Sequence, residues 1–330
     1  MTSKPPFSAL TARLIRTIGN SIAPRGKGEG RLCIVNYHRI LEQGDPLLES
    51  EPNLATFEWH MQLLAECFHV MPLQEALDTL ATERMPPRAV CITFDDGYRS
   101  THDLALPVLN KLQLPASVFI TTGHMDQGSM WNDMILEAIR QQPSGELDLR
   151  SAGLAVYPLR STADRKATAN QVTESTKYLP PTARSELLKT LEALAGKSLQ
   201  QSLMLTREMI IELAQNNIEI GGHTITHPIL TKLDDDAARF EIMENKRQLE
   251  DIIGKPISLF AYPNGKTGMD YDQRHVTMVE QAGYRAAFTT EVGAVTRQNH
   301  PYEIPRSRPW DASPLMFSGR LLQWLMGRNT

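Results

Sequence analysis

The sequence predicts an α/β protein: a (β/α) barrel, distorted or incomplete, that carries a helical insertion. Short apolar runs typical of buried strands alternate with amphipathic helical patterns, which is the sequence sign of parallel βαβ units. The alternation stops between residue 123 and about residue 205 and then resumes. A length of 330 residues suits one such barrel with an insertion.

Each predicted strand is a short apolar run bounded by polar or turn residues. We expect strands at 32–36, 89–92, 116–121, 218–222, 258–262, 285–289 and 302–305. The helices between them have apolar residues at three-to-four spacing and ordinary start and stop signals. Thr206 can cap one helix, and Gly254 with Pro256 beyond it ends another. We expect these helices at 57–68, 104–112, 206–216, 237–253 and 275–282.

Residues 123–205 are interpreted as a helical cap near the mouth of the barrel. Within them, 131–140 predicts a helix, 147–160 is ambiguous, and 163–195 is polar and mainly helical with a break at Pro180-Pro181. Structureless loops of this length are uncommon inside compact domains. We therefore expect the insertion to be ordered and functional.

Both ends of the chain are basic and amphipathic. Residues 1–28 contain no acid and place an apolar helical face beside basic residues, and residues 311–330 contain a second amphipathic helix with no acid after Asp311. The barrel itself is expected at 29–310. The two helices either lie on an anionic membrane surface or pack on the barrel or on a second copy, and the sequence leaves both open.

Composition excludes several classes of function. A formal net charge of −4 and the lack of a basic block argue against a nucleic-acid partner. The three cysteines, Cys33, Cys67 and Cys91, lack metal spacing and indicate a reducing compartment. No apolar run is long enough to span a membrane, and no signal peptide is recognised. We expect a cytoplasmic protein, either free or peripheral on the inner membrane.

Chemistry-bearing residues follow two of the predicted strands. Asp95 and Asp96 end the second strand, where buried charges need a partner or a metal, and His223 and His227 follow the fourth. One carboxylate and two imidazoles make a metal set that leaves positions for water. Because successive strand residues face opposite ways, both aspartates serve one site only if the chain turns at Gly97. The alternatives are a solvated turn and a pair of structural histidines.

The chain resembles the polysaccharide deacetylases of the NodB-homology type, carbohydrate esterase family 4. Residues 93–97 (Thr-Phe-Asp-Asp-Gly) match the first motif of that family, and residues 223–228 (His-Thr-Ile-Thr-His-Pro) match the second. Residues 260–265 (Phe-Ala-Tyr-Pro-Asn-Gly) are a variant of the third. The similarity extends from about Arg31 to Arg308 and implies a seven-stranded, distorted barrel.

The resemblance assigns Asp96, His223 and His227 as metal ligands and Asp95 as the base that takes a proton from water. Two histidines and one aspartate suit Zn²⁺, and Co²⁺, Ni²⁺ or Mn²⁺ stay open. The histidines are expected on a strand end and its loop, since His227 precedes a proline and is biased away from helical angles.

The third motif departs from the family pattern. The family often has an arginine at the position of Ala261, where it holds the catalytic aspartate. Something else must therefore restrain Asp95, or its pKa is set differently. Tyr262, Pro263 and Asn264 are expected beside the substrate, with the backbone N–H of Asn264 as the oxyanion donor.

The late Leu-x-His motif of the family, which supplies the general acid, is not found. His300 lies near its place, in a polar loop where a solvated histidine is expected. We prefer His38, at the end of the first predicted strand, because an imidazole near Asp95 can hold a proton at neutral pH. A structural role for His38, with Asp95 as both base and acid, is the alternative. Trp131 and Asp133 either contact sugar or only start the insertion.

The predicted function is that of a metal-dependent hydrolase. It would remove N-acetyl groups from amino sugars of a bacterial polysaccharide or of its lipid-linked precursor. Its partners would be the N-acetylated glycan and, peripherally, a membrane or an exopolysaccharide synthesis complex. Two alternatives remain: deformylation or other deacylation of a lipid-linked amino sugar, and a non-catalytic carbohydrate-binding or scaffold protein that retains the metal site.

Overall fold

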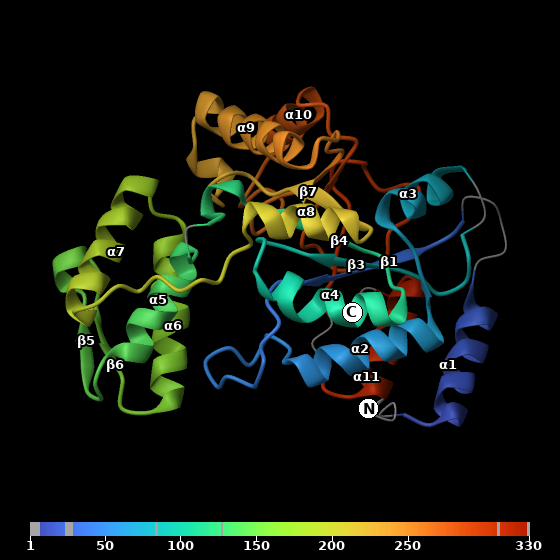
Figure 1. Ribbon diagram of the computed structural model, residues 1–330, viewed down its shortest axis with the longest axis horizontal. Helices are drawn as coiled ribbons and strands as arrows, with labels where there is room; N and C mark the ends of the chain where they lie inside the picture. Colours follow the sequence, from blue (N-terminus) through green and yellow to red (C-terminus); the bar gives the residue numbers. More distant parts are fainter. Residues whose placement is uncertain (1–6, 24–28, 83–84, 127, 309–310, 329–330) are drawn as a thin grey trace.

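The computed structural model of the chain consists of a barrel with a helical lobe at its side (Figure 1). It describes residues 7–23, 29–82, 85–126, 128–308 and 311–328. Residues 1–6 and 24–28 of the basic N-terminal segment and residues 329–330 at the other end lie outside the described residues.

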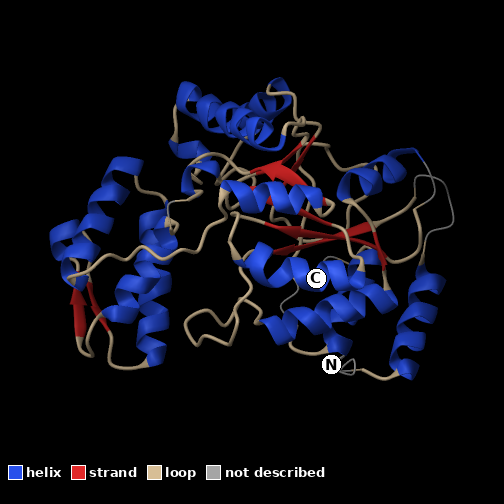
Figure 2. Cartoon of the chain, in the orientation of Figure 1, coloured by secondary structure: helices blue, strands red, loops and turns tan. Residues whose placement is uncertain are grey.

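The centre of the fold is a seven-stranded parallel sheet (Figure 2). The strand order is β1-β3-β4-β7-β8-β9, and β2 pairs with the start of β3. The strands are β1 (Leu32–Tyr37), β2 (His69–Val70), β3 (Ala89–Phe94), β4 (Ala116–Ile120), β7 (Ile218–Gly222), β8 (Leu259–Ala261) and β9 (Ala286–Phe288). The sheet curls with helices around it, which confirms the prediction of a distorted (β/α) barrel.

The segment 304–307 joins the two edges of the sheet. The backbone N–H of Ile304 donates to Ala287 on β9 at 2.9 Å, and the N–H of Ser307 donates to Ile34 on β1 at 2.9 Å. The expected strand at 302–305 is therefore wrong as a strand, because only isolated bridges form there. Pro305 has no N–H to donate to a continuous ladder.

Alternate strand residues fill two cores, as a two-residue period requires. Leu32 and Ile34 of β1 belong to the cluster inside the barrel, where Phe119 and Phe288 meet with ring centroids 5.3 Å apart. Residues of opposite orientation, such as Val35, pack against the surrounding helices. Apolar side chains pack in the barrel interior, and in barrels of this kind the chemistry-bearing residues lie at the carboxyl ends of the strands.

Helices cover the outside of the sheet (Figure 2). They are α2 (Leu54–Cys67), α3 (Leu73–Thr82), α4 (Leu106–Leu112) after a π-helical turn (Thr101–Ala105), α8 (Arg207–Gln215), α9 (Asp235–Ile253) and α10 (Gln273–Gln281), with 3₁₀ turns at Thr122–His124 and Leu230–Lys232. The side chains of Asn53, Thr206 and Asp234 cap α2, α8 and α9 as helix N-terminal residues do. Sequence periodicity indicated all of these α-helices except α3, which was not predicted.

The insertion forms a lobe beside the barrel, at the left of Figure 1. It contains α5 (Trp131–Gln141), β5 (Glu146–Asp148), a 3₁₀ turn (Arg150–Ala152), β6 (Val156–Pro158), α6 (Thr162–Lys177) and α7 (Pro181–Ala195). The ambiguous stretch 147–160 thus contains a 3₁₀ turn and parts of a small antiparallel pair of strands. The lobe has its own apolar core, which includes Ile135, Val172 and Leu191.

The terminal helices pack on the barrel and on each other. In α1 (Ala9–Ile22) Ala12 and Ile15 are buried, and α11 (Pro314–Leu325) buries one whole face against α2 and β1. Leu10, Leu14 and Ile18 nevertheless remain 76%, 54% and 41% exposed and form an apolar stripe on α1. Among the described residues, no helix is both long and apolar enough to cross a membrane.

Candidate metal and catalytic site

The structure brings Asp96, His223 and His227 together at the carboxyl ends of β3 and β7. The Asp96 Oδ1 atom lies 3.4 Å from the Nε2 atom of each histidine. One ligand atom from each of the three residues lies within 4.8 Å of the other two. This spacing suits a single ion that all three could coordinate.

The backbone around the site is strained. Asp96, Thr224, His227 and Asn264 all have positive φ angles, of 73°, 64°, 52° and 60°. Such angles are uncommon for residues other than glycine and concentrate at functional sites. The turn expected at Gly97 therefore begins one residue earlier, at Asp96, and this brings the second carboxylate round to the same side as the first.

The orientation of His223 is fixed by two buried contacts. Its Nδ1–H donates to the backbone carbonyl of Ala261 at 2.7 Å, which leaves Nε2 as the atom facing Asp96. Its backbone N–H donates to Asn245 on α9 at 3.0 Å. Metal-binding histidines are commonly held through the second ring nitrogen in this way. Residue 261 thus orients the His223 ring through its backbone carbonyl, a contact that does not depend on its side chain.

Hydrogen bonds also hold the loop that carries His227. The Thr224 hydroxyl accepts the His227 N–H at 3.2 Å. Glu241 on α9 accepts the N–H of Ile225 at 2.7 Å and that of Thr226 at 2.9 Å, and also the Thr226 hydroxyl at 2.6 Å. Asn245 and Glu241 give no sequence signal beyond their positions on an amphipathic helix, so they could not be predicted.

The electrostatics of the triad favour a cation. The Asp96 Oδ1 atom is buried and accepts no hydrogen bond. Burial would lower the pKa of His223, but the Asp96 carboxylate beside its Nε2 atom and the charge of Asp95 outweigh burial and raise that pKa. The pKa of His227 falls to about 3, chiefly through burial, so this ring is a neutral donor of a lone pair. The residues present therefore fit a divalent ion.

Asp95 is held by Arg306, a residue that the sequence did not identify. The two guanidinium nitrogens of Arg306 donate to the two carboxylate oxygens at 2.6 and 2.8 Å, and Asn36 Nδ2 donates to Asp95 Oδ2 at 2.9 Å. Although burial raises the pKa of Asp95, Arg306 and His223 outweigh it, and the pKa is about 2. Arg306 thus supplies the restraint that Ala261 cannot. The only sequence signal is an arginine after Ile304-Pro305, at the last barrel edge.

His38 lines the same cavity as Asp95 and Asp96, and His300 does not. His300 is exposed in a turn, as expected. The charge of Asp95 does raise the pKa of His38, but burial and the Arg308 guanidinium outweigh the carboxylates and lower it. The expectation that this imidazole holds a proton at neutral pH is therefore wrong. The Nδ1 atom of His38 is buried without a hydrogen-bond partner.

Tyr262, Pro263 and Asn264 of the third motif were all expected beside the substrate, but only Asn264 lines the cavity. Asn264 lines the cavity, and its Nδ2 atom is buried without a hydrogen-bond partner. Tyr262 does not line it: its ring stacks on Tyr271 at 3.8 Å in the core, and its N–H donates to Phe288 at 3.1 Å. Pro263 is buried and also stands back from the cavity. The strand pattern could not separate a core tyrosine from one beside the substrate.

Trp131 and Asp133, at the start of α5, face the barrel. Trp131 lines the catalytic cavity, and its Nε1–H is buried without a partner. Asp133 accepts the N–H of Met130 at 3.3 Å, which starts the helix, and the hydroxyl of Tyr98 at 3.1 Å. Burial raises the pKa of Asp133 to about 6, although the positive charge of Arg39 lowers it. Asp133 therefore has the helix-starting role and also borders the adjoining part of the cleft.

The site opens into a cavity of about 420 Å³, within the usual range for ligand pockets. Barrel and lobe both contribute walls: Asp96 on one side, and Trp131, Thr173 and Lys177 on the other. Lys177 is nearly buried, and its Nζ atom lies 3.9 Å from Asp270, too far for a hydrogen bond. The lobe thus completes a pocket whose chemistry-bearing groups come from the sheet.

A parallel barrel with a candidate metal triad and a restrained aspartate at its strand ends defines the class of protein. Residues 82–287, more than half of the chain, match the family model described as polysaccharide deacetylase. The chain therefore belongs to the polysaccharide deacetylase family, whose members are hydrolases acting on carbon–nitrogen bonds other than peptide bonds.

Curated relatives agree with this assignment. YxkH of Bacillus subtilis (strain 168), which carries a polysaccharide deacetylase name, is 24% identical over 280 residues, 84% of this chain and 71% of its own. The poly-beta-1,6-N-acetyl-D-glucosamine N-deacetylase of Staphylococcus epidermidis is 29% identical over 147 residues, which are 40% of this chain and 49% of that protein. Hence this chain aligns with about half the length of the staphylococcal enzyme.

Solved structures share the fold. The deacetylase PplD of Streptococcus pyogenes, in complex with acetate, superposes with a TM-score of 0.60 at 18% identity, covering 90% of this chain and 99% of that one. IcaB from Ammonifex degensii gives a TM-score of 0.58 at 17% identity, covering 92% and 99%. Identities this low establish the barrel architecture alone.

Proposed function

We propose that this protein is a metal-dependent N-deacetylase of amino sugars in a bacterial polysaccharide. The observation that carries the proposal is the pairing of the triad Asp96, His223 and His227 with a carboxylate, Asp95, restrained beside it. Amide hydrolysis needs a Lewis acid, a proton acceptor and a proton donor within one pocket. The cavity offers candidates for all three.

Asp96, His223 and His227 would hold the ion, with Zn²⁺ as the first candidate and Co²⁺, Ni²⁺ or Mn²⁺ open. When bound, a divalent ion supplies Lewis acidity that polarises a carbonyl and lowers the pKa of water. The chain contributes the orientation: Ala261 fixes the His223 ring through its carbonyl, and Thr224 fixes the turn before His227. The strained backbone keeps these donors on one side of the cavity.

Asp95 would take the proton from the attacking water. Arg306 and Asn36 hold its carboxylate in one position, so it needs no reorientation during the reaction. His38 would protonate the departing amine. Its lowered pKa makes the protonated imidazole scarce at neutral pH but a stronger acid, which suits donation to a poor leaving group. Asn264 would contribute its backbone N–H to the carbonyl oxygen.

The substrate class is drawn from the relatives and from the pocket. The staphylococcal relatives are named for poly-β-1,6-N-acetyl-D-glucosamine, and we propose an N-acetylglucosamine polymer or its lipid-linked precursor for this chain. Deformylation of a lipid-linked amino sugar is the second candidate, because the pocket chemistry would serve any small acyl amide. One reason for the non-catalytic alternative was that Ala261 cannot hold Asp95 as an arginine would. Arg306 forms an ion pair with Asp95 instead, so this reason no longer applies.

For location we propose a peripheral position at the inner face of a membrane, alone or with an exopolysaccharide synthesis complex. The exposed stripe of Leu10, Leu14 and Ile18, with Arg13 exposed beside it, supports this proposal. A basic amphipathic helix of this kind is typical of membrane-surface binding.

Acetate release tests the proposed function. The purified protein, loaded with Zn²⁺, should release acetate from short β-1,6-linked N-acetylglucosamine oligomers. Release should stop after chelation and return when the ion is restored. The N-formyl analogue of the same oligomer distinguishes the second candidate, which would require preferential release of formate. Retention of the ion without release of any acyl group would support the non-catalytic alternative and contradict the proposal.

A further inference from the structure

The lobe wall of the catalytic cavity carries hydrogen-bond donors that have no acceptor among the described residues. Trp131 is 7% exposed, and its Nε1–H is buried without a partner. Lys177 is 8% exposed, and its ammonium group donates no hydrogen bond to any described residue. On the barrel side, the Nδ2 atom of Asn264 is also buried without a partner. Buried donors are costly unless a ligand accepts their hydrogen bonds.

Lys177 is oriented by contacts that do not use its N–H groups. Its Nζ atom lies 3.9 Å from the fully buried carboxylate of Asp270 and 5.3 Å from the centre of the Tyr178 ring. The other oxygen of Asp270 accepts the backbone N–H of Lys266 at 3.0 Å. Lys177 therefore balances the charge of Asp270, but at these distances it donates a hydrogen bond to neither neighbour.

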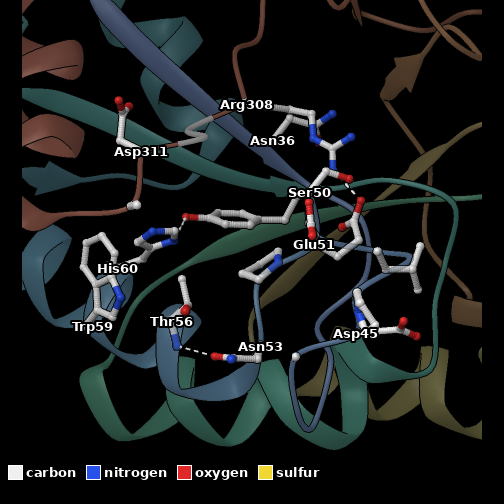
Figure 3. Close-up of a pocket in the computed structure, with 17 residues that line it drawn as sticks. Asn36, Asp45, Ser50, Glu51, Asn53, Thr56, Trp59, His60, Arg308 and Asp311 are labelled. Atoms are coloured by element: carbon white, nitrogen blue, oxygen red, sulfur yellow. Dashed lines mark hydrogen bonds and ion pairs between the residues drawn. The ribbon is translucent and has the colours of Figure 1, made fainter. Parts of the chain in front are cut away.

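The other buried cations of the cavity already have partners. Four basic and three acidic side chains line it: Lys177, Lys266, Arg306 and Arg308, with Asp95, Asp96 and Glu174. Arg306 forms its ion pair with Asp95. Arg308 is paired with Glu51 at 2.5 Å (Figure 3). Lys177 differs from both arginines, because its donors face the cavity without an acceptor.

The set of unpaired donors predicts the chemistry of the ligand. Sugar hydroxyl groups donate as well as accept, so a site for them needs acceptors too. Here the buried groups are the donors of Lys177, Trp131 and Asn264, and the exposed Lys266 adds a second ammonium group. The acidic side chain of Glu174 is exposed, and solvent screens its charge. An anion that only accepts hydrogen bonds satisfies this set, and lysine is a common ligand of phosphate.

We infer that the lobe wall binds a phosphate group of the substrate, and that Lys177 sets this specificity. The substrate would be an N-acetylated amino sugar whose anomeric carbon is linked to phosphate, as in a carrier-linked precursor. This inference rests on the proposed function and chooses the precursor over the finished, neutral polymer. The exposed stripe on α1 agrees with this choice, because a lipid-phosphate carrier lies at a membrane surface.

Binding of two small probes tests the inference. Glucosamine 1-phosphate and methyl glucosaminide differ in the anomeric substituent, and both lack the acyl group that the enzyme would remove. The Zn²⁺-loaded wild type should bind the phosphate roughly tenfold more tightly in titration calorimetry, the effect of one charge-assisted hydrogen bond. Lys177→Met keeps an unbranched side chain without the charge and should abolish the preference. Lys177→Arg restores a cation and should recover part of it.

Controls separate the role of Lys177 from those of the metal and the fold. Lys189→Met, exposed on α7 outside the cavity, should keep the wild-type preference. Phosphate bound only by Zn²⁺ would persist in Lys177→Met, so the metal content of each variant is measured as well. Because Lys177 balances the charge of Asp270, the double variant Lys177→Met with Asp270→Asn removes both charges and should lose the preference equally.

Turnover provides a second readout. In the wild type, kcat/KM for acetate release should be roughly tenfold higher for N-acetylglucosamine 1-phosphate than for methyl N-acetylglucosaminide. This ratio should fall in Lys177→Met and stay unchanged in Lys189→Met. A disaccharide of N-acetylglucosamine and glucuronic acid tests the other source of negative charge, an acidic polymer. If that disaccharide is preferred over the 1-phosphate and Lys177→Met removes its preference, the phosphate assignment is overturned.

Two further results would overturn the inference. One is equal wild-type affinity for glucosamine 1-phosphate and methyl glucosaminide. The other is an undiminished phosphate preference in both Lys177→Met and the double variant. Acetate release from β-1,6-linked oligomers without any phosphate preference would leave the proposed function standing, so the two failures are distinguishable.

Discussion

The barrel mouth and the insertion lobe border the same cavity but satisfy their polar groups differently. At the barrel mouth Asp95 has hydrogen-bond partners on both carboxylate oxygens. The Nδ1–H of His223 donates to the backbone carbonyl of Ala261. On the lobe, the Trp131 Nε1 atom has no partner, and Lys177 has one ion contact at 3.9 Å. The sheet thus fixes Asp95 and His223 through hydrogen bonds, whereas Trp131 and Lys177 on the lobe keep donors available for a ligand. Asp96, His38 and Asn264 at the mouth also keep a buried polar atom without a partner.

The largest effect is expected at the barrel mouth. Asp95→Asn should retain the metal and lose about 10²-fold or more in turnover, the usual range for removal of a general base. It also leaves the buried charge of Arg306 unpaired, which costs about 3–5 kcal/mol of folding free energy. Turnover should therefore be measured together with metal content and with thermal unfolding.

The double variant Asp95→Asn with Arg306→Gln is the control for this prediction. It removes both buried charges, so stability should return toward that of the wild type while turnover stays low. If Asp95→Asn hydrolyses at nearly the wild-type rate, the water is activated by another group, and the barrel mouth is not the fixed catalytic region described above.

His38 gives the second effect, again on the barrel side. His38→Ala should keep the metal and lose turnover on acetamides, because the amine leaves poorly without a proton. Esters should lose less, since an alkoxide departs more readily. His300→Ala, at an exposed turn outside the cavity, is the control and should be close to neutral for both substrates. Intact amide turnover in His38→Ala, with loss in His300→Ala, would show that the late loop supplies the acid.

A smaller effect is expected on the lobe. Trp131→Phe removes an N–H that has no partner in the protein, so folding stability should change little. If that N–H binds the substrate, KM should rise by about 2- to 10-fold, the value of one hydrogen bond, with kcat unchanged. A fall in kcat at constant KM would instead place Trp131 with the reacting groups and would break the contrast between the two regions.

The smallest effect concerns the terminal helix far from the cavity. If the stripe of Leu10, Leu14 and Ile18 lies on a membrane, the protein should pellet with anionic vesicles at low salt and be released as salt screens the charges. Leu14→Glu should prevent pelleting and leave acetate release unchanged. Equal recovery with and without vesicles at low salt would mean that α1 serves only to pack on the barrel.

The sequence predicted the strands and helices that have a periodic apolar pattern. It did not predict contacts between residues that are far apart in the chain. The strand-helix alternation and the residues Asp95, Asp96, His223 and His227 could be read because each follows a recognisable strand. Arg306 could not, since its role depends on a late segment crossing between the two edges of the sheet. No one-dimensional pattern records that crossing.

Two further errors have the same cause. A strand pattern does not say which side of β8 faces the core, so Tyr262 was expected beside the substrate although it stacks on Tyr271. The pKa of His38 was expected to rise because Asp95 is near. It falls because burial and Arg308, neither visible in the local sequence, outweigh the carboxylate.

The central claim is that Asp96, His223 and His227 form one metal site, and metal content tests it most directly. Element analysis of the purified wild type should find close to one divalent ion per chain. The double variant His223→Ala with His227→Ala should lose it, while Asp95→Asn and His300→Ala should keep it. Full occupancy in the double variant would contradict the assignment of the site and the mechanism built on it.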